Sequence, residues 1–304
     1  MKKKRLMQIL GGTAAALTVW SVVAMAGQVS LQDREAAVVL AAENGKKQDS
    51  IVSKEVAFSD SWTYGEFSAI HTGKAVLYEN HQDNANGITV CVNAGHGCKG
   101  GEKKKTYCHP DKTPKVTGGS TGAGATKATA INSGMTFADG TPEADVTLAM
   151  ALILKQRLLD SGYHVLMVRE TEDSQLDNIA RTLMANNKAD CHIALHWDST
   201  SSDKGAFFMS IPSSKSYRAM EPVASHWEEH ERLGRALIQG LKDRGVKIFG
   251  KGEMQMDLTQ TSYSTVPSVD VELGDKKSDY SEAALQNMAE GLVAGVDAFF
   301  SKGQ

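Results

Sequence analysis

The stretch that decides the fold is Ile88–Gly97, "ITVCVNAGHG", an apolar run that stops abruptly at a histidine between two glycines. Short apolar runs of this kind are typical of strands that are buried on both faces of a parallel sheet. Ligands of such sheets bind beyond the carboxyl ends of the strands, so His96 stands where a functional side chain is expected. Gly95 and Gly97 would let the backbone turn tightly and point the imidazole out over the strand end.

Strand-like and helix-like segments alternate through the rest of the chain. Helical spacing of apolar residues predicts helices over 142–162, 175–189, 221–245 and 281–300, and apolar runs predict strands over 73–80, 87–93, 164–170, 191–198, 205–213 and 267–274. This alternation predicts an α/β domain with a twisted, largely parallel sheet and helices on both faces. We expect this domain to span residues 88–304, after an N-terminal extension over 27–87 that contributes edge strands.

The first 26 residues have the layout of a secretory signal peptide. Four basic residues, "KKKR", precede an apolar run over 6–26 that ends in the small-x-small pattern "AMA". The run is also about as long as a spanning helix, which needs roughly 20 residues, so an uncleaved membrane anchor is the alternative. In either case we expect a bacterial protein that is secreted or associated with the cell wall.

Charge narrows the choice of partners. Removal of residues 1–26 would leave 29 basic and 36 acidic residues, a net charge of −7. This balance argues against nucleic acid as a partner and gives no electrostatic attraction to anionic membranes. We expect contact with a membrane only through an uncleaved signal segment.

The four cysteines can be oxidised in an exported protein. Cys98 and Cys108 flank a polar loop and are candidates for a disulfide. Cys91 and Cys191 each lie in an apolar run, where packing as small core residues explains them as well as a bridge does. No close Cys-x-x-Cys pair is present, so a four-cysteine zinc site is not expected.

Four side chains fall where the predicted strands end. His96 follows the first apolar run, His196 and Glu272 lie near the ends of two others, and Glu143 opens the helix over 142–162. Two histidines and a carboxylate supply the protein ligands of a catalytic zinc site, and a further carboxylate can act as general base. Structural readings stay open: a turn cap for His96, a core histidine for His196, and an ordinary first-turn acid for Glu143. Glu272 is harder to dismiss, because a carboxylate in an apolar strand is seldom buried unpaired.

A rival metal motif lies in the helix over 221–245. The stretch "HWEEH" fits the pattern H-x-x-E-H of inverted zinc peptidases, with His226 and His230 on one helix face and Glu229 as base. A third ligand would still be needed, for which Glu253 or Glu272 could serve. The alternative without a metal is a charged helix face exposed to solvent, which the neighbouring charged residues favour.

The ordered blocks resemble a known family. "ITVCVNAGHG", Glu143 at a helix start, "GYHVLMVRETED", "LDNIARTLMANNKADCHIALHWDS" and "VPSVDVELG" are similar, in this order, to the zinc-dependent N-acetylmuramoyl-L-alanine amidases of the amidase-3 family. The resemblance runs from about Ile88 to Phe300. It implies a single α/β domain and cleavage of the amide bond between N-acetylmuramic acid and L-alanine in peptidoglycan or its muropeptide fragments.

The resemblance also implies roles for particular residues. It implies that Zn2+ is held by His96, Glu143 and His196, and that Glu272 is the catalytic carboxylate. Arg169, Arg181 and Asn186 also match family positions, where they are expected to support the scaffold or the residues around the site.

Some features depart from the family pattern. Trp197 and Asp198 follow His196, and "ELGDKKSDY" replaces the usual continuation after the glutamate–glycine pair. The 46 residues of 97–142 form an unusually long separation between the first two ligands. We interpret them as a long inserted loop beside the site that serves as a lid or selects the substrate. The departures after His196 and Glu272 motivate one alternative, a catalytically degenerate amidase-like protein that binds or regulates the cell wall. A further alternative is a related zinc peptidase acting on stem peptides.

Overall fold

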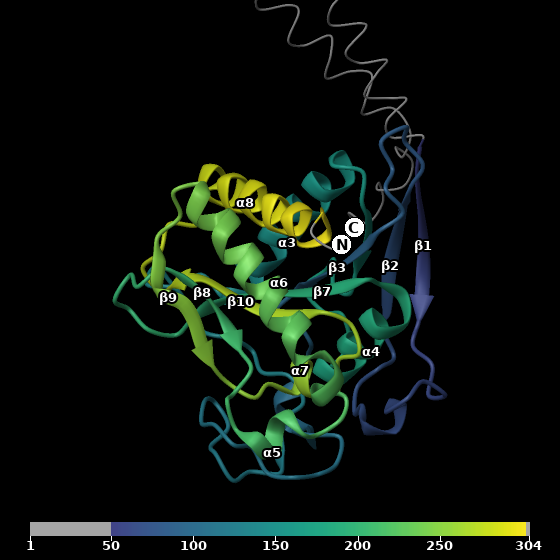
Figure 1. The fold of residues 1–304 in the computed structure, drawn as a ribbon, viewed down its shortest axis with the longest axis vertical. Helices are drawn as coiled ribbons and strands as arrows, with labels where there is room; N and C mark the ends of the chain where they lie inside the picture. The colour runs from purple at the N-terminus through teal and green to yellow at the C-terminus, as the bar shows by residue number, and fades with distance from the viewer. Residues whose placement is uncertain (1–49, 302–304) are drawn as a thin grey trace, which may run out of the picture. The chain divides into compact units, whose positions relative to one another are not determined.

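An eight-stranded mixed sheet forms the centre of residues 50–301, the part of the chain that the computed structural model describes (Figure 1). The strand order is β1-β2-β6-β3-β7-β10-β8-β9. The prediction of a signal peptide over residues 1–26 lies outside the described residues, as does the first part of the extension. In chain order the strands of this sheet are β1 Ile51–Ala57, β2 Lys74–Asn80, β3 Thr89–Ala94, β6 His164–Met167, β7 Cys191–Asp198, β8 Ala206–Ser210, β9 Ile248–Gln255 and β10 Ser268–Asp275.

The four central strands, β6, β3, β7 and β10, run parallel to one another. On one side β2 pairs antiparallel with β6 and with β1, and on the other β8 pairs antiparallel with β10. The α/β fold class is confirmed, with antiparallel strands added around a parallel centre. The carboxyl ends of β3, β7 and β10 therefore meet at one edge of the sheet.

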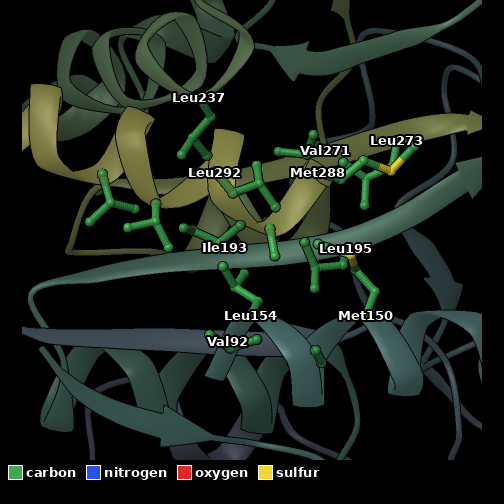
Figure 2. Packing of buried hydrophobic residues seen from close by; sticks show 14 of the residues in the cluster. Val92, Met150, Leu154, Ile193, Leu195, Leu237, Val271, Leu273, Met288 and Leu292 are labelled. Atoms are coloured by element: carbon green, nitrogen blue, oxygen red, sulfur yellow. The ribbon is translucent and has the colours of Figure 1, made fainter. Parts of the chain in front are cut away.

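Helices cover both faces of the sheet (Figure 1). Helices α3, α6 and α8 pack on one face and share a hydrophobic core with it, which Figure 2 shows around Val92, Ile193 and Leu237. Helix α4 packs with the other face, where Cys91 and Leu166 point away from the first core. The helical segments are η1 Gly65–Phe67, η2 Gly101–Lys103, α3 Glu143–Asp160, α4 Asn178–Lys188, α5 Lys215–Arg218, α6 Val223–Asp243, α7 Thr259–Tyr263 and α8 Glu282–Ser301.

This two-sided burial explains the apolar runs of the central strands. Val90 and Val92 belong to the core under α3, and Cys91 between them belongs to the core under α4. Successive side chains of a strand point to opposite faces, so a strand covered on both sides needs apolar residues at every position. No helix within residues 50–301 is long and apolar enough to cross a membrane.

The inserted segment 97–142 has secondary structure of its own. A small antiparallel hairpin, formed by β4 Lys105–Tyr107 and β5 Lys127–Thr129, lies within it, together with η2. The strands are only three residues long and rich in lysine and threonine. The sequence therefore contains no apolar pattern from which they could be predicted.

The prediction of a disulfide between Cys98 and Cys108 is wrong, because all four cysteines of the described residues are buried free thiols. Cys98 lies near Arg181 and Asp173, whereas Cys108 lies near Lys115 and Asp257. The two thiols occupy separate environments. Burial raises the pKa of both.

Candidate metal centre and active site

Three predicted metal ligands, His96, Glu143 and His196, converge at the carboxyl edge of the central strands. Nε2 of His96 lies 2.8 Å from Oε1 of Glu143, and Nδ1 of His196 lies 3.0 Å from that nitrogen and 3.1 Å from that oxygen. His96 follows β3, His196 lies in β7 and Glu143 is the first residue of α3. One potential ligand atom from each residue therefore faces a common point.

The turn that carries His96 is held in an uncommon backbone conformation. His96 has φ = 65°, the left-handed region that a residue with a side chain rarely adopts. The buried Arg181 stabilises the turn by donating to the carbonyl of Ala94 at 2.9 Å and to that of His96 at 2.6 Å. It also donates to the side chain of Asn93 at 3.0 Å. Burial lowers the pKa of Arg181 to about 9.

A second buried guanidinium, Arg169, holds the same turn from the other side. It donates to the carbonyls of Ala94 at 3.0 Å, Gly95 at 2.9 Å and Ala144 at 2.7 Å. Because Ala144 adjoins Glu143, Arg169 joins the first and second ligand segments through their main chains. Asn186 lies elsewhere: it ties α4 to the connection before β10 by hydrogen bonds with Tyr263 and Thr265.

Main-chain donors fix the carboxylate of Glu143. Oε2 accepts from the backbone N–H of Met135 at 2.8 Å, and Oε1 accepts from that of Trp197 at 3.0 Å. A Cβ at Gly134 would lie 2.7 Å from the ring of His96 and 2.9 Å from Glu143, so this position needs glycine. Burial alone would raise the pKa of Glu143, but hydrogen bonds with His196 and His96 outweigh it and lower that pKa.

The outer nitrogens of the two histidines have different partners. Nδ1 of His96 lies 3.0 Å from the carbonyl oxygen of Asn132, and Nε2 of His196 lies 3.6 Å from Oδ2 of Asp270. Burial would lower the pKa of His196, but Asp270 and then Glu143 raise it to about 10. Gly95 permits this packing, because a Cβ there would lie 2.3 Å from the His196 ring.

Glu272 lies beside the cluster. It is opposite His196 in the parallel pairing of β10 with β7, and both residues line the same cavity. Its Oε2 is buried without a hydrogen-bond partner, and so is Oδ1 of Asp270 two residues earlier. Burial and the neighbouring Asp270 raise the pKa of Glu272 well above its ordinary value. A carboxylate in this state is suited to accepting a proton or a hydrogen bond from a molecule in the cavity.

The donor set fits a zinc ion. Two imidazole nitrogens and one carboxylate oxygen are the protein ligands of many catalytic zinc sites, which leave the fourth position open. The outer partners, Asn132 and Asp270, are a carbonyl and a carboxylate, the groups that orient metal-binding histidines. Within residues 50–301 this is the one cluster of three or more such side chains whose ligand atoms lie close enough together to hold an ion.

The rival motif at His226 and His230 does not form a metal site. Nδ1 of His230 accepts the backbone N–H of Ser268 at 3.0 Å, and Nδ1 of His226 lies 2.8 Å from the carbonyl of Pro222. Glu229 pairs with Arg232 at 2.6 Å. Burial lowers the pKa of His230 to about 3, as expected for a neutral core histidine.

A family profile described as N-acetylmuramoyl-L-alanine amidase matches residues 90–297, well over half of the chain. The chain belongs to this amidase family. The family and the enzyme class that the ordered sequence blocks predict are thereby confirmed. No curated protein sequence matches the chain.

Solved amidases have the same fold. The apo form of the N-acetylmuramyl-L-alanine amidase Ami1 from Mycobacterium abscessus is similar with a TM-score of 0.54 and 20% identity, covering 71% of this chain and 99% of that one. Ami1 from Mycobacterium smegmatis matches with a TM-score of 0.54 and 20% identity, over 73% of this chain and 100% of that one. An N-acetylmuramoyl-L-alanine amidase from Clostridium difficile 630 matches with a TM-score of 0.50 and 16% identity, over 72% and 100%.

The inserted segment of this amidase forms a wall of the site cavity, which has a volume of about 690 Å3. The segment is fastened to the connection between β9 and α7 by the buried Asp257. This carboxylate accepts from His109 at 3.0 Å, from the N–H of Val116 at 2.7 Å and from the N–H of Thr117 at 3.0 Å, and it pairs with Lys115 at 3.1 Å. These contacts to one buried carboxylate hold residues 109–117 against the β9–α7 connection.

The residues that depart from the family pattern, which follow His196 and Glu272, make contacts of their own. Trp197 is buried and packs edge-on against Phe137, with ring centroids 6.0 Å apart, and Asp198 pairs with Lys204. After Glu272, the buried Asp275 accepts the backbone N–H groups of Ser202, Lys204 and Lys277. Asp198 and Asp275 therefore fix the loops that follow His196 and Glu272.

Sequence reasoning missed Asp270 and Asp257. Asp270 stands two positions before Glu272 in one strand, so the period of two places both carboxylates on one face. That signal was available in "SVDVELG". Asp257 lies in a polar connection without a motif, and nothing in the sequence marks its contacts with a segment more than a hundred residues earlier.

Proposed function

We propose that this member of the amidase family is an exported zinc enzyme that hydrolyses the amide bond between the lactyl group of N-acetylmuramic acid and L-alanine in peptidoglycan. One observation carries the proposal: the ligand atoms of His96, Glu143 and His196 face one point, and the unpartnered carboxylate of Glu272 lies beside them in the same cavity. Family membership supplies the reaction class.

Zn2+ would be held by Nε2 of His96, a carboxylate oxygen of Glu143 and Nδ1 of His196. When bound, the ion lowers the pKa of a coordinated water and polarises the carbonyl that is attacked. The chain prepares this site itself. Backbone N–H groups hold Glu143, and Asn132 and Asp270 face the outer nitrogens of the histidines.

Glu272 moves the proton. Its free Oε2 accepts a proton from the attacking water, whose oxygen forms the new bond to the carbonyl carbon. As the carbon–nitrogen bond breaks, Glu272 returns that proton to the nitrogen of alanine. The products are the lactyl carboxylate on the sugar and a stem peptide with a free L-alanine amino terminus.

Export is supported by the basic, apolar and small-residue pattern of residues 1–26. Peptidoglycan lies outside the cytoplasmic membrane, so an exported chain reaches its substrate. The protein would then be secreted or associated with the wall, or anchored through residues 6–26 if the segment is not removed.

The test is mass spectrometry of the products formed by residues 27–304 on purified peptidoglycan, with zinc and with a chelator. Zinc-dependent release of stem peptides that begin at L-alanine is expected. Glu272→Gln is the control for contaminating hydrolases. Release of fragments cut within the stem would replace the proposal by a peptidase, and zinc binding without any release would replace it by a degenerate wall-binding protein.

A further inference from the structure

A second hollow borders the hairpin β4–β5. It has a volume of about 420 Å3 and lies between the segment that begins with η1 and the hairpin. Three lysines and two aromatic rings dominate its lining: Lys105, Lys112, Lys127, Phe67 and Tyr107. The mechanism of amide hydrolysis uses none of them.

The two aromatic residues that line this hollow, Phe67 and Tyr107, pack against each other and against the protein interior. Phe67 packs edge-on against Tyr107, with ring centroids 6.0 Å apart, and against the buried Tyr263 at 5.8 Å. The hydroxyl of Tyr263 donates to the backbone carbonyl of Tyr107 at 3.2 Å. The rings are thus tied to the hydrophobic cluster beside α4, and the hollow is a fixed feature of the fold.

The lysines bring uncompensated positive charge together. Nζ of Lys112 lies 5.2 Å from the ring centroid of Tyr107, and Nζ of Lys127 lies 4.6 Å from the same centroid. Within the described part of the chain, neither these two ammonium groups nor that of Lys105 has a carboxylate at ion-pair distance, although Glu66 also lines the hollow. Like charges that share one ring repel each other, and a bound anion relieves the repulsion.

The hairpin β4–β5 borders both this hollow and the catalytic cavity. Tyr107 pairs with Lys127 across the hairpin and Lys105 pairs with Thr129, so these four residues share a face. Lys105, Thr106, Tyr107 and Lys127 line the hollow, whereas Ala128 and Thr129, further along β5, line the catalytic cavity. Because Lys127 and Ala128 are adjacent in β5, the hollow and the catalytic cavity are neighbours along this strand.

We propose that this lysine hollow binds carboxylate groups of the peptidoglycan strand next to the stem peptide that is cut. The inference rests on the proposed function, because it takes the substrate to be a polymer with repeated carboxylates. Ammonium groups form charge-assisted hydrogen bonds with carboxylates, and the half-buried rings of Phe67 and Tyr107, which line the hollow, offer apolar contact to the sugar or peptide between them. The hollow thus favours the polymer over isolated fragments.

The test compares the double variant Lys105→Gln/Lys127→Gln with the charge-matched control Lys242→Gln/Lys251→Gln, whose lysines lie on α6 and β9. Each protein is assayed on polymeric peptidoglycan, freed of phosphate-bearing polymers, and on a soluble monomeric muropeptide. Pelleting with the polymer is measured in parallel, at low and at physiological salt. A polymer with amidated carboxylates is the matched substrate control.

We expect the lysine variant to lose about three- to tenfold in cleavage and pelleting of the polymer at low salt, from two exposed ion pairs. The loss should shrink at physiological salt, where screening acts within about 8 Å. Cleavage of the monomer should be unchanged, and the amidated polymer should not distinguish the proteins. An equal loss on monomer and polymer, or no loss on the polymer, would overturn the proposal. If the unchanged enzyme cleaves neither substrate, the proposed function fails, while weaker pelleting of the lysine variant alone would still support the hollow.

Discussion

Nε2 of His196 lies 3.6 Å from Oδ2 of Asp270, on the side of the imidazole ring away from the other two ligand atoms. Nδ1 of the same ring lies 3.0 Å from Nε2 of His96 and 3.1 Å from Oε1 of Glu143. The two nitrogens of one histidine thus have separate tasks. One faces the candidate metal position, and the other faces Oδ2 of a buried carboxylate whose Oδ1 has no hydrogen-bond partner.

Replacing Asp270 with Asn should weaken zinc binding by about 10- to 100-fold, because the carboxylate orients His196 and increases the basicity of its ring. The dissociation constant can be measured by competition with a chelating indicator, without substrate. Glu272→Gln is the matched control, since it neutralises a neighbouring carboxylate that is not a ligand. Unchanged zinc affinity in Asp270→Asn would show that His196 is oriented by its packing against Gly95 alone.

Replacing Glu272 with Gln should reduce kcat by at least about 10²-fold, because glutamine has the same shape but cannot accept a proton. Zinc content, determined by atomic absorption after dialysis, should match that of the unchanged protein. A Glu272→Gln protein with full turnover would exclude Glu272 as the catalytic carboxylate and direct attention to Asp270.

Replacing His96 with Ala should abolish both zinc binding and turnover, because only two ligands remain and three are needed for a stable site. The fold should persist, since Arg169 and Arg181 hold the turn through carbonyl oxygens rather than through the imidazole. Metal content and circular dichroism test the two parts separately. His226→Ala is the control, and it should retain zinc.

Replacing Asp257 with Asn should loosen the inserted segment and destabilise the protein by about 1–3 kcal/mol, because buried donors lose a charged acceptor. Hydrogen exchange should rise around residues 109–121, and KM should rise more than kcat falls. Exposed Asp243→Asn is the control. If exchange stays unchanged in this segment, other contacts hold the wall.

The carboxylate of Asp257 should also make the stability of the inserted segment depend on pH. Burial would raise the pKa of Asp257, but hydrogen bonds from His109 and Thr117 outweigh it and lower that pKa. A lowered pKa in the folded protein gives stability that is present above the unfolded value of about 3.9 and is lost as the pH falls towards the folded value. The hydrogen-exchange protection factors of residues 109–121, which correct for the intrinsic pH dependence of exchange, should therefore be constant between about pH 5 and 7 and fall only in strong acid.

The central strands could be predicted from the sequence because burial on both faces requires a continuous run of apolar residues. The run "CHIALHWD" is strand β7 residue for residue, and the helix expected over 142–162 is found over Glu143–Asp160. Strands β1 and β9 contain no such apolar run, since their residues are mostly exposed and β9 contains two glycines. Edge strands need apolar residues on one face at most, so their patterns resemble those of loops.

The candidate site was predictable to the extent that strand ends converge. His96, His196 and Glu272 each follow or end an apolar run, and a parallel sheet brings such positions to one edge. The wall at Asp257 and the hairpin β4–β5 depend on contacts between segments far apart in the chain. No local pattern encodes them, and the same holds for the separation of Cys98 from Cys108.

The two arginines that hold the histidine turn also bear on the candidate metal site. Their guanidinium groups satisfy the carbonyls around His96 from within the protein, so we expect this turn to keep its conformation without the ion. With zinc as the cofactor, as we propose, folding and activity would depend on different quantities: the same folded molecule would be active or silent according to the zinc available to it.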